Sequence, residues 1–293
     1  MTLLTRQTDA AGNQSPFASL DLIIDLTAPV APALTSPLEG SFIATATPML
    51  LGSCESGAQV EVLEGASVLC SASCAGGTFS CLSSTLSDGN HQLYARQTDA
   101  AGNASASSSL RTFSIDTQVA VATLSQPGAG VSLSTLTPTF GGACETGATV
   151  TVSAGAQVLC TATCSASSYS CVSAALPEGA QSVSVVQVDQ AGNTSTASAQ
   201  LAFTLDVTSP QAPAVLAPVA SALLASATPQ VSGSCESGST VNLFEGASPK
   251  CSASCVSGVF NCTSAALSDG AHLLLARQTD AAGNISPDAS VSF

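Results

Sequence analysis

Short stretches of alternating apolar and polar residues, separated by turn residues every 8 to 12 or so positions, run along the whole chain. In one of these stretches Leu50, Gly52 and Cys54 share a face by the two-residue period of a β-strand. No stretch has the 3.6-residue period of an amphipathic helix. Roughly seven such strands in each ~90 residues are typical of a two-sheet sandwich, so we predict an all-β fold.

The chain repeats itself with a period of about 90 residues. The string RQTDAAGN occurs at 6–13, 96–103 and 277–284, and a degenerate copy occupies 186–193. We therefore predict tandem sandwich repeats at 26–116, 117–206 and 207–293. Residues 1–25 match only the last two strands of a unit, and we expect them to be the end of a preceding, truncated repeat.

The next-to-last strand of each unit shows which face is buried. Two positions of this strand, two residues apart, are apolar in each of the three repeats. The position between them varies and is Tyr94, Ser184 or Leu275. Residues at two successive apolar positions of this strand are Leu3, Leu93, Val183 and Leu274, followed by Thr5, Ala95, Val185 and Ala276. We expect these to face the core of each sandwich.

Composition narrows the range of partners. Charged residues are 8 % of the chain, and 19 carboxylates against 5 basic residues give a net charge of −14. Such a balance argues against nucleic acid or anionic lipid as a partner, because both require a basic face. No stretch reaches the roughly 18 to 20 apolar residues of a membrane span, and the first residues do not resemble a signal peptide, so whatever exports the chain lies outside it.

The order Thr-Pro, Gly-x-Cys-Glu-x-Gly, Gly-x-Phe-x-Cys, Asp-Gly-x-His-x-Leu, Asp-Ala-Ala-Gly-Asn, Ile-Asp-Thr resembles the bacterial immunoglobulin-like repeats that form stalk modules of large surface adhesins and biofilm proteins of Gram-negative bacteria. This resemblance implies an elongated array of immunoglobulin-like β-sandwiches located outside the cell or at its surface. The chain departs from the family pattern in having four cysteines per unit.

Twelve cysteines, four per unit at fixed spacing, predict disulfides rather than a metal site. Cys70 and Cys74 lie four residues apart on one strand, roughly 13 Å, which is too far for a bond between them. Either Cys54 pairs with Cys74 and Cys70 with Cys81, or Cys54 pairs with Cys70 and Cys74 with Cys81. We prefer the first, because a tight turn at Ala75-Gly76 would bring Cys70 opposite Cys81. The preferred bonds are Cys54–Cys74, Cys70–Cys81, Cys144–Cys164, Cys160–Cys171, Cys235–Cys255 and Cys251–Cys262.

Repeated carboxylates predict calcium at the junctions between repeats, a feature that the family resemblance also implies. In an immunoglobulin-like sandwich the BC turn, here with Glu55, Glu145 and Glu236, and the FG turn, here with Asp99, Asp189 and Asp280, lie at the pole next to the preceding unit's last strand. That strand ends in Asp25, Asp116 and Asp206, so three acids converge there, and calcium accepts six to eight such oxygens. The alternative is that Asp-x-x-Gly-Asn is only a good turn sequence. The expected ligand sets are Asp25, Glu55 and Asp99; Asp116, Glu145 and Asp189; and Asp206, Glu236 and Asp280. Turn chemistry is enough to explain Asp88, Glu178 and Asp269, each of which precedes a glycine in the EF turn at the opposite pole.

Catalytic residues are not expected. His91 and His272 occupy equivalent positions at a strand start, where the second unit has Gln181, so we interpret them as surface or strand-edge residues. We predict that the protein is not an enzyme but a stalk or spacer segment of an extracellular adhesin. The alternatives are a subunit of an extracellular filament or biofilm matrix, and a glycan- or protein-binding module. The expected partners are other repeats of the parent chain, or further copies that associate into a fibre.

Overall fold

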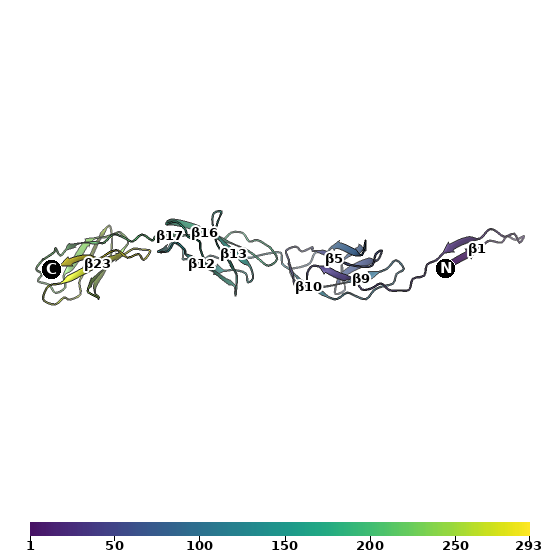
Figure 1. Ribbon diagram of the computed structural model, residues 1–293, viewed down its shortest axis with the longest axis horizontal. Helices are drawn as coiled ribbons and strands as arrows, with labels where there is room; N and C mark the ends of the chain where they lie inside the picture. The colour runs from purple at the N-terminus through teal and green to yellow at the C-terminus, as the bar shows by residue number, and fades with distance from the viewer. The chain divides into compact units, whose positions relative to one another are not determined.

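The computed structural model describes all 293 residues and is built of strands and loops without a helix (Figure 1). No helical segment of the length and hydrophobicity that a bilayer span requires is present. The chain forms two compact units, one of residues 1–118 with 190–193 and one of residues 119–189 with 194–293. The all-β tandem sandwich fold predicted from the sequence is confirmed.

A separate two-stranded hairpin opens the first unit. Strand β1 (Thr2–Thr5) pairs antiparallel with β2 (Ala18–Asp21), with Leu3 opposite Leu20. The alternation rule placed Leu3 in a core, but its side chain is 39 % exposed. The β1–β2 hairpin is a two-stranded sheet with no second sheet packed on the face that carries Leu3, so Leu3 stays exposed although the pattern is the same.

The first repeat is a sandwich of two sheets. The smaller sheet has the order β3-β5-β8 and the larger one β4-β10-β9-β6-β7, with β4 parallel to β10 and all other pairs antiparallel. Its strands are β3 (Ala33–Ser36), β4 (Phe42–Ile43), β5 (Met49–Ser53), β6 (Gln59–Glu64), β7 (Ser67–Ser73), β8 (Thr78–Leu82), β9 (Gly89–Thr98) and β10 (Arg111–Ile115).

In the second unit the same plan occurs twice. The second repeat has sheets β12-β15 and β11-β17-β16-β13-β14, and the third has β18-β19-β22 and β21-β20-β23-β24. The strands of the second are β11 (Ser132–Leu133), β12 (Thr139–Ala143), β13 (Thr149–Ala154), β14 (Gln157–Thr163), β15 (Ser168–Val172), β16 (Gly179–Val188) and β17 (Leu201–Leu205). Those of the third are β18 (Ala214–Ala217), β19 (Gln230–Ser234), β20 (Thr240–Glu245), β21 (Ser248–Ser254), β22 (Val259–Thr263), β23 (Leu273–Thr279) and β24 (Ala289–Ser292).

Each core is built from the inward positions of both sheets. In the first repeat Leu50 on β5 and Leu93 on β9 are completely buried, and Phe113 on β10 is 1 % exposed. The predicted inward positions of β9, β16 and β23 are all completely buried, namely Leu93, Ala95, Val183, Val185, Leu274 and Ala276. The alternation pattern therefore identified the core strand of all three repeats correctly.

The glycine of the Gly-x-Cys motif permits a close approach of neighbouring strands within the smaller sheet. An ideal Cβ on Gly52 would lie 2.2 Å from the carbonyl oxygen of Ala33 and 2.3 Å from the ring of Phe79. At Gly142 the same atom would lie 2.0 Å from the carbonyl oxygen of Thr123. Backbone of the first strand therefore approaches the second strand at a distance that only glycine allows.

Candidate functional site

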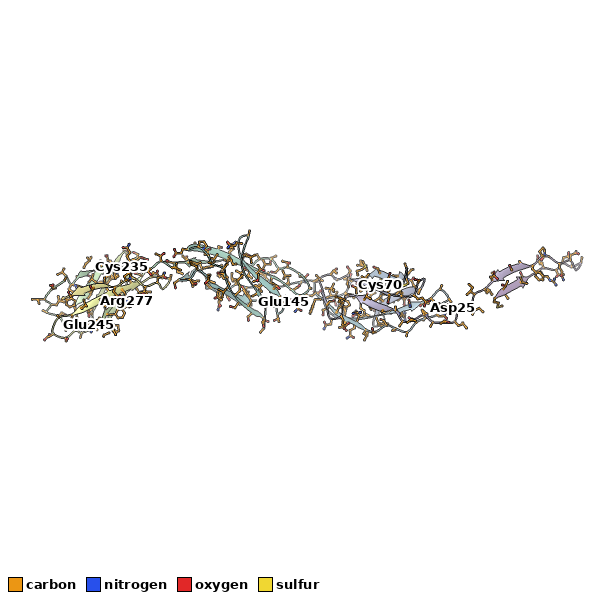
Figure 2. All side chains as sticks on the ribbon, viewed as in Figure 1. Asp25, Cys70, Glu145, Cys235, Glu245 and Arg277 are labelled. Atoms are coloured by element: carbon orange, nitrogen blue, oxygen red, sulfur yellow. A yellow bond between two sulfur atoms is a disulfide. The ribbon has the colours of Figure 1, made fainter.

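Six disulfides lie within the repeats, two in each, and no cysteine is free. In the first repeat Cys54 bonds Cys74 and Cys70 bonds Cys81, with Cα–Cα distances of 5.9 and 6.0 Å. The other repeats have the equivalent bonds Cys144–Cys164, Cys160–Cys171, Cys235–Cys255 and Cys251–Cys262. This is the preferred one of the two pairings considered above. The labelled Cys70 and Cys235 belong to the first and third repeat (Figure 2).

The disulfides connect the two sheets rather than neighbouring strands of one ladder. Strand β7, with Cys70, is the edge of the larger sheet, and β8, with Cys81, is the edge of the smaller one. The turn between them has Gly76 and Gly77 at positive φ, where a glycine is favoured. Each sandwich is thus covalently joined along the side where both sheets end.

A buried glutamine organises the pole of each repeat that carries the BC turn. Gln97 on β9 is 2 % exposed; its Oε1 accepts a bond of 2.9 Å from the backbone N–H of Glu55, and its Nε2 donates to the carbonyl of Val30. The second and third repeats have the same two bonds, to the N–H 42 residues earlier and to the carbonyl 67 residues earlier. They join Gln187 to Glu145 and Ala120, and Gln278 to Glu236 and Gln211. The amide therefore ties the BC turn to the chain entering each sandwich.

The FG turn uses its aspartate and asparagine together. Asp99 Oδ1 accepts bonds from the backbone N–H of Ala101 and Asn103, and its Oδ2 accepts one of 2.8 Å from Asn103 Nδ2. These bonds, the amide of Asn103 first, hold the pKa of Asp99 below its usual value. At Asp280 burial raises the pKa, but bonds from Asn284 and the backbone outweigh it and the pKa is lowered. Both aspartates are therefore already engaged as turn formers.

The asparagine of the FG turn also reaches the end of the preceding strand. Asn103 Nδ2 donates to the carbonyl of Asp25 at 3.2 Å, and the equivalent amides of Asn193 and Asn284 donate at 2.7 Å to the carbonyls of Asp116 and Asp206. Both ends of each connecting segment are therefore held by side-chain amides, the FG asparagine at one end and the buried glutamine at the other.

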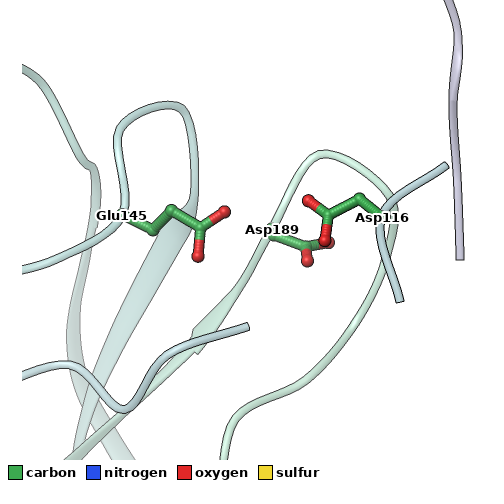
Figure 3. A group of neighbouring side chains, drawn as sticks. All are labelled: Asp116, Glu145 and Asp189. Atoms are coloured by element: carbon green, nitrogen blue, oxygen red, sulfur yellow. The ribbon is translucent and has the colours of Figure 1, made fainter. Parts of the chain in front are cut away.

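One of the three predicted acidic sets is brought together. Carboxylate oxygens of Asp116, Glu145 and Asp189 lie within 4.8 Å of one another, with Asp189 8 % exposed and the other two half-buried (Figure 3). The sets Asp25, Glu55, Asp99 and Asp206, Glu236, Asp280 do not form such a group. The connection from Asp116 to Ala120 is one residue shorter than those from Asp25 to Val30 and from Asp206 to Gln211, and it lacks their proline.

The acids of the EF turn have a partner that the sequence did not reveal. Asp88 accepts bonds from the backbone N–H and hydroxyl of Thr117 at 3.2 and 3.0 Å. Glu178 does the same for Val207 and Thr208, at 2.6 and 3.1 Å. These carboxylates therefore fasten the residues that follow the last strand, a role beyond turn formation.

The prediction of a surface or strand-edge position was wrong for His91. His91 is buried, with 7 % of its surface exposed, and its ring contacts Glu64 on β6 and the EF turn. It lies on the same face as Leu93 and Ala95 by the two-residue period, which is the signal that we overlooked. Two arginines pair with nearby acids, Arg96 with Glu61 at 2.8 Å and Arg277 with Asp288 at 2.9 Å.

Comparison with solved structures finds remote likenesses of low identity and low TM-score. Similar solved structures include fibronectin(III)-like modules of CbhA from Clostridium thermocellum, 16 % identical over 60 % of this chain and 94 % of that one, with a TM-score of 0.39. A marsupial T cell receptor is 8 % identical over 90 % and 98 % of the two chains, with a TM-score of 0.45. The BSP domain of a biofilm associated protein is 11 % identical over 90 % and 66 %, with a TM-score of 0.23. At these identities the likeness concerns the fold alone.

No curated protein sequence matches the chain. The family model described as the bacterial Ig-like domain matches three times, at residues 39–117, 133–207 and 220–293. These segments together make up more than half of the chain, and each contains the two disulfides, the buried glutamine and the FG turn described above. The chain therefore belongs to the bacterial Ig-like domain family and contains three of its domains in tandem.

Proposed function

We propose that this chain is a structural stalk or spacer segment of an extracellular bacterial adhesin. The observation that carries the proposal is that all three repeats have the same two disulfides and the same glutamine and asparagine bonds to the connecting segment. A ligand site would normally make one repeat differ from the others. The same disulfides and the same glutamine and asparagine bonds in every repeat instead stabilise the array as a whole. Domains of this kind are generally not catalytic, which supports a mechanical role.

The covalent features also support a location outside the cell. Two disulfides per ~90 residues are typical of proteins in oxidising compartments and are rare in the cytosol. Cores with few large aromatic residues gain stability from such bonds, about 3 kcal/mol for a loop of some 15 residues. On the surface of a bacterium, the same bonds would limit how far a pulled repeat can extend.

Imaging of the native particle by negative-stain electron microscopy tests this proposal. A thin string of single chains, shortened in steps when whole repeats are deleted, is the result expected for a stalk. A thick fibre of many chains would favour a filament or biofilm matrix subunit instead, and compact particles that bind a glycan or a protein would favour a binding module. Either of the last two results would overturn the stalk assignment.

We further propose that calcium binds at the set formed by Asp116, Glu145 and Asp189. Every candidate ligand is a carboxylate oxygen, which is the donor type that calcium prefers. Carboxylates this close repel one another unless a cation or a proton lies between them, and Asp189 is largely shielded from water. At the other two junctions the proposal rests on the sequence repeat alone, because their acids do not come together as Asp116, Glu145 and Asp189 do.

Isothermal titration of chelator-treated protein with calcium tests this second proposal. We expect uptake at or below millimolar calcium, and loss of one bound ion in the Asp189→Ala variant. The matched control is Asp288→Ala, which removes a carboxylate paired with Arg277 and lying outside all three junction sets. If wild-type protein takes up no calcium at millimolar concentration, or Asp189→Ala binds as many ions as wild type, the junction acids are turn formers only.

A further inference from the structure

Two of the three repeats enclose a histidine at the start of the central strand. In the first repeat His91 Nδ1 lies 2.9 Å from Glu64 Oε1, and Nε2 lies 2.8 Å from the carbonyl oxygen of Ser87. In the third, His272 Nδ1 lies 2.5 Å from Glu245 Oε1, and Nε2 lies 2.7 Å from the carbonyl of Ser268. The two imidazole side chains are 8 % and 9 % exposed, so the protein supplies nearly all of their surroundings.

Both partners of each ring are acceptors. A backbone carbonyl oxygen can only accept a hydrogen bond, so Nε2 must be an N–H donor. The carboxylate facing Nδ1 likewise requires a proton between the two groups, whether that proton is assigned to the nitrogen or to the oxygen. A neutral imidazole has only one N–H, so it can donate to only one of these two acceptors. If the carboxylate is ionised, the lone pair of the other ring nitrogen then faces the lone pair of an oxygen, which is repulsive.

We propose that the pairs His91–Glu64 and His272–Glu245 each retain a shared proton at neutral and mildly alkaline pH, and so form a proton-dependent clasp in the first and third repeats but not in the second. Each clasp joins three elements of its repeat: the strand that carries the histidine, the strand that ends in the glutamate, and the EF turn that supplies the carbonyl. Loss of the proton removes one of the two bonds that the imidazole makes.

The second repeat has the same contact without a titratable group. Gln181 occupies the histidine position, and its Nε2 donates to the carbonyl of Pro177 at 2.8 Å, four residues earlier in the chain, as in the other repeats. The glutamate position is Ala154. An amide N–H satisfies the turn carbonyl at any pH, so this repeat serves as an internal reference in which the clasp does not titrate.

Charged groups around the two pairs differ. Glu245 also accepts an ion pair from Lys250 on β21, at 2.9 Å, where the first repeat has Leu69. The rings of Phe113 and Phe293 pack 5.9 and 6.2 Å from the two imidazoles and contribute no charge. Asp88 and Asp269 follow the two turn carbonyls in sequence, and Asp88 is bonded to Thr117. The carboxylate of the clasp is thus the group that directly balances each imidazolium.

Electrostatics at the third repeat agree with this geometry. The bond to Glu245, and then the bond to the Ser268 carbonyl, raise the pKa of His272 above its usual value, and bonds from His272 and Lys250 lower the pKa of Glu245. A raised histidine pKa means stability that is present below the unfolded pKa near 6.5 and is lost as the pH rises through the folded pKa. A lowered glutamate pKa means stability that is lost as the pH falls through that folded value. The clasp therefore stabilises the fold most in the mildly acid range.

Nitrogen-15 NMR of the full chain labelled at its two histidines tests the proposal. At pH 7.5 an imidazole with an ordinary pKa near 6.5 is neutral by about tenfold. We expect instead that both ring nitrogens of both histidines are predominantly protonated at pH 7.5. In Glu64→Gln and Glu245→Gln, the histidine of the altered repeat should return to the neutral form, while the other histidine is unchanged.

Two further variants complete the design. Glu61→Gln removes a carboxylate on the same strand as Glu64, but one that pairs with Arg96, and it should leave His91 doubly protonated. The double change Gln181→His with Ala154→Glu should add a third doubly protonated histidine to the spectrum. A bare ring nitrogen in wild-type His91 or His272 at pH 7.5 would overturn the proposal, as would a histidine that stays doubly protonated after its glutamate is replaced.

Discussion

Reduction of the disulfides should lengthen each pulled repeat by about 70 Å. In the oxidised first repeat, force travelling along the chain from Cys54 passes through the bond to Cys74, back four residues to Cys70, and through the second bond to Cys81. Residues 55–69 and 75–80 therefore carry no load while the bonds are intact. After reduction the whole segment from Cys54 to Cys81 carries the load and can extend.

The magnitude follows from the covalent geometry. Between Cys54 and Cys81 the reduced chain has 27 peptide links, which extend to about 97 Å at roughly 3.6 Å each. The oxidised path has four links and two bridges with Cα–Cα distances of 5.9 and 6.0 Å, about 26 Å in total. Because the spacing is the same in the other two repeats, three repeats should gain roughly 210 Å.

Single-molecule pulling by atomic force microscopy measures this directly. The full chain is tethered at its ends and unfolded with and without a reductant, and the contour length gained per unfolding event is compared. A double variant of one repeat, Cys54→Ser with Cys74→Ser, should give an intermediate gain of about 37 Å in that repeat only, because the Cys70–Cys81 bond remains and 16 peptide links return to the path. Equal contour lengths in oxidised and reduced protein would show that the bonds do not form and would refute the reasoning.

Three further changes have expected outcomes that thermal or denaturant unfolding can check. Gln187→Ala should destabilise the second repeat by about 1–3 kcal/mol, because the Glu145 N–H and the Ala120 carbonyl lose a part-buried partner; an unchanged midpoint would mean that water replaces the amide. Gly142→Ala should cost at least about 1–3 kcal/mol, since its Cβ would collide with backbone, and unaltered stability would show that the first strand can move away. Ser167→Gly should stabilise by about 0.5–1 kcal/mol because Ser167 has a φ of +61°, and a loss of stability would contradict this argument from backbone strain.

The periodic features of this protein could be read from its sequence because each one recurs. The 90-residue period, the inward positions of the central strand, and the four cysteines all agree between copies, so one interpretation must satisfy three instances. Distance limits along a strand left two pairings open, and a turn at Ala75-Gly76 favoured the one with Cys54 bonded to Cys74. What the sequence left open is that Cys70 and Cys81 lie on the edges of opposite sheets rather than in one ladder.

The buried histidine and glutamine side chains were not predicted, although the sequence contained a signal for them. The two-residue period that places Leu93 and Ala95 in the core also places His91 and Gln97 there, and a polar residue at an inward position needs a partner. Those partners could not be found by spacing, since the carbonyl bonded by Gln97 lies 67 residues away. The three acidic sets are equivalent in sequence, but only Asp116, Glu145 and Asp189 come together. Their close approach depends on the segment that connects the repeats as well as on the turns.

The confinement of every disulfide to one repeat has a consequence for how such proteins change over evolutionary time. Recombination between similar stretches of DNA adds or removes whole copies of a repeat. Because no covalent bond joins cysteines of different repeats, a gene that gains or loses a copy still encodes a chain in which every cysteine has its partner. The number of repeats can therefore change without leaving an unpaired cysteine, so the length of such a protein can change without loss of its disulfides.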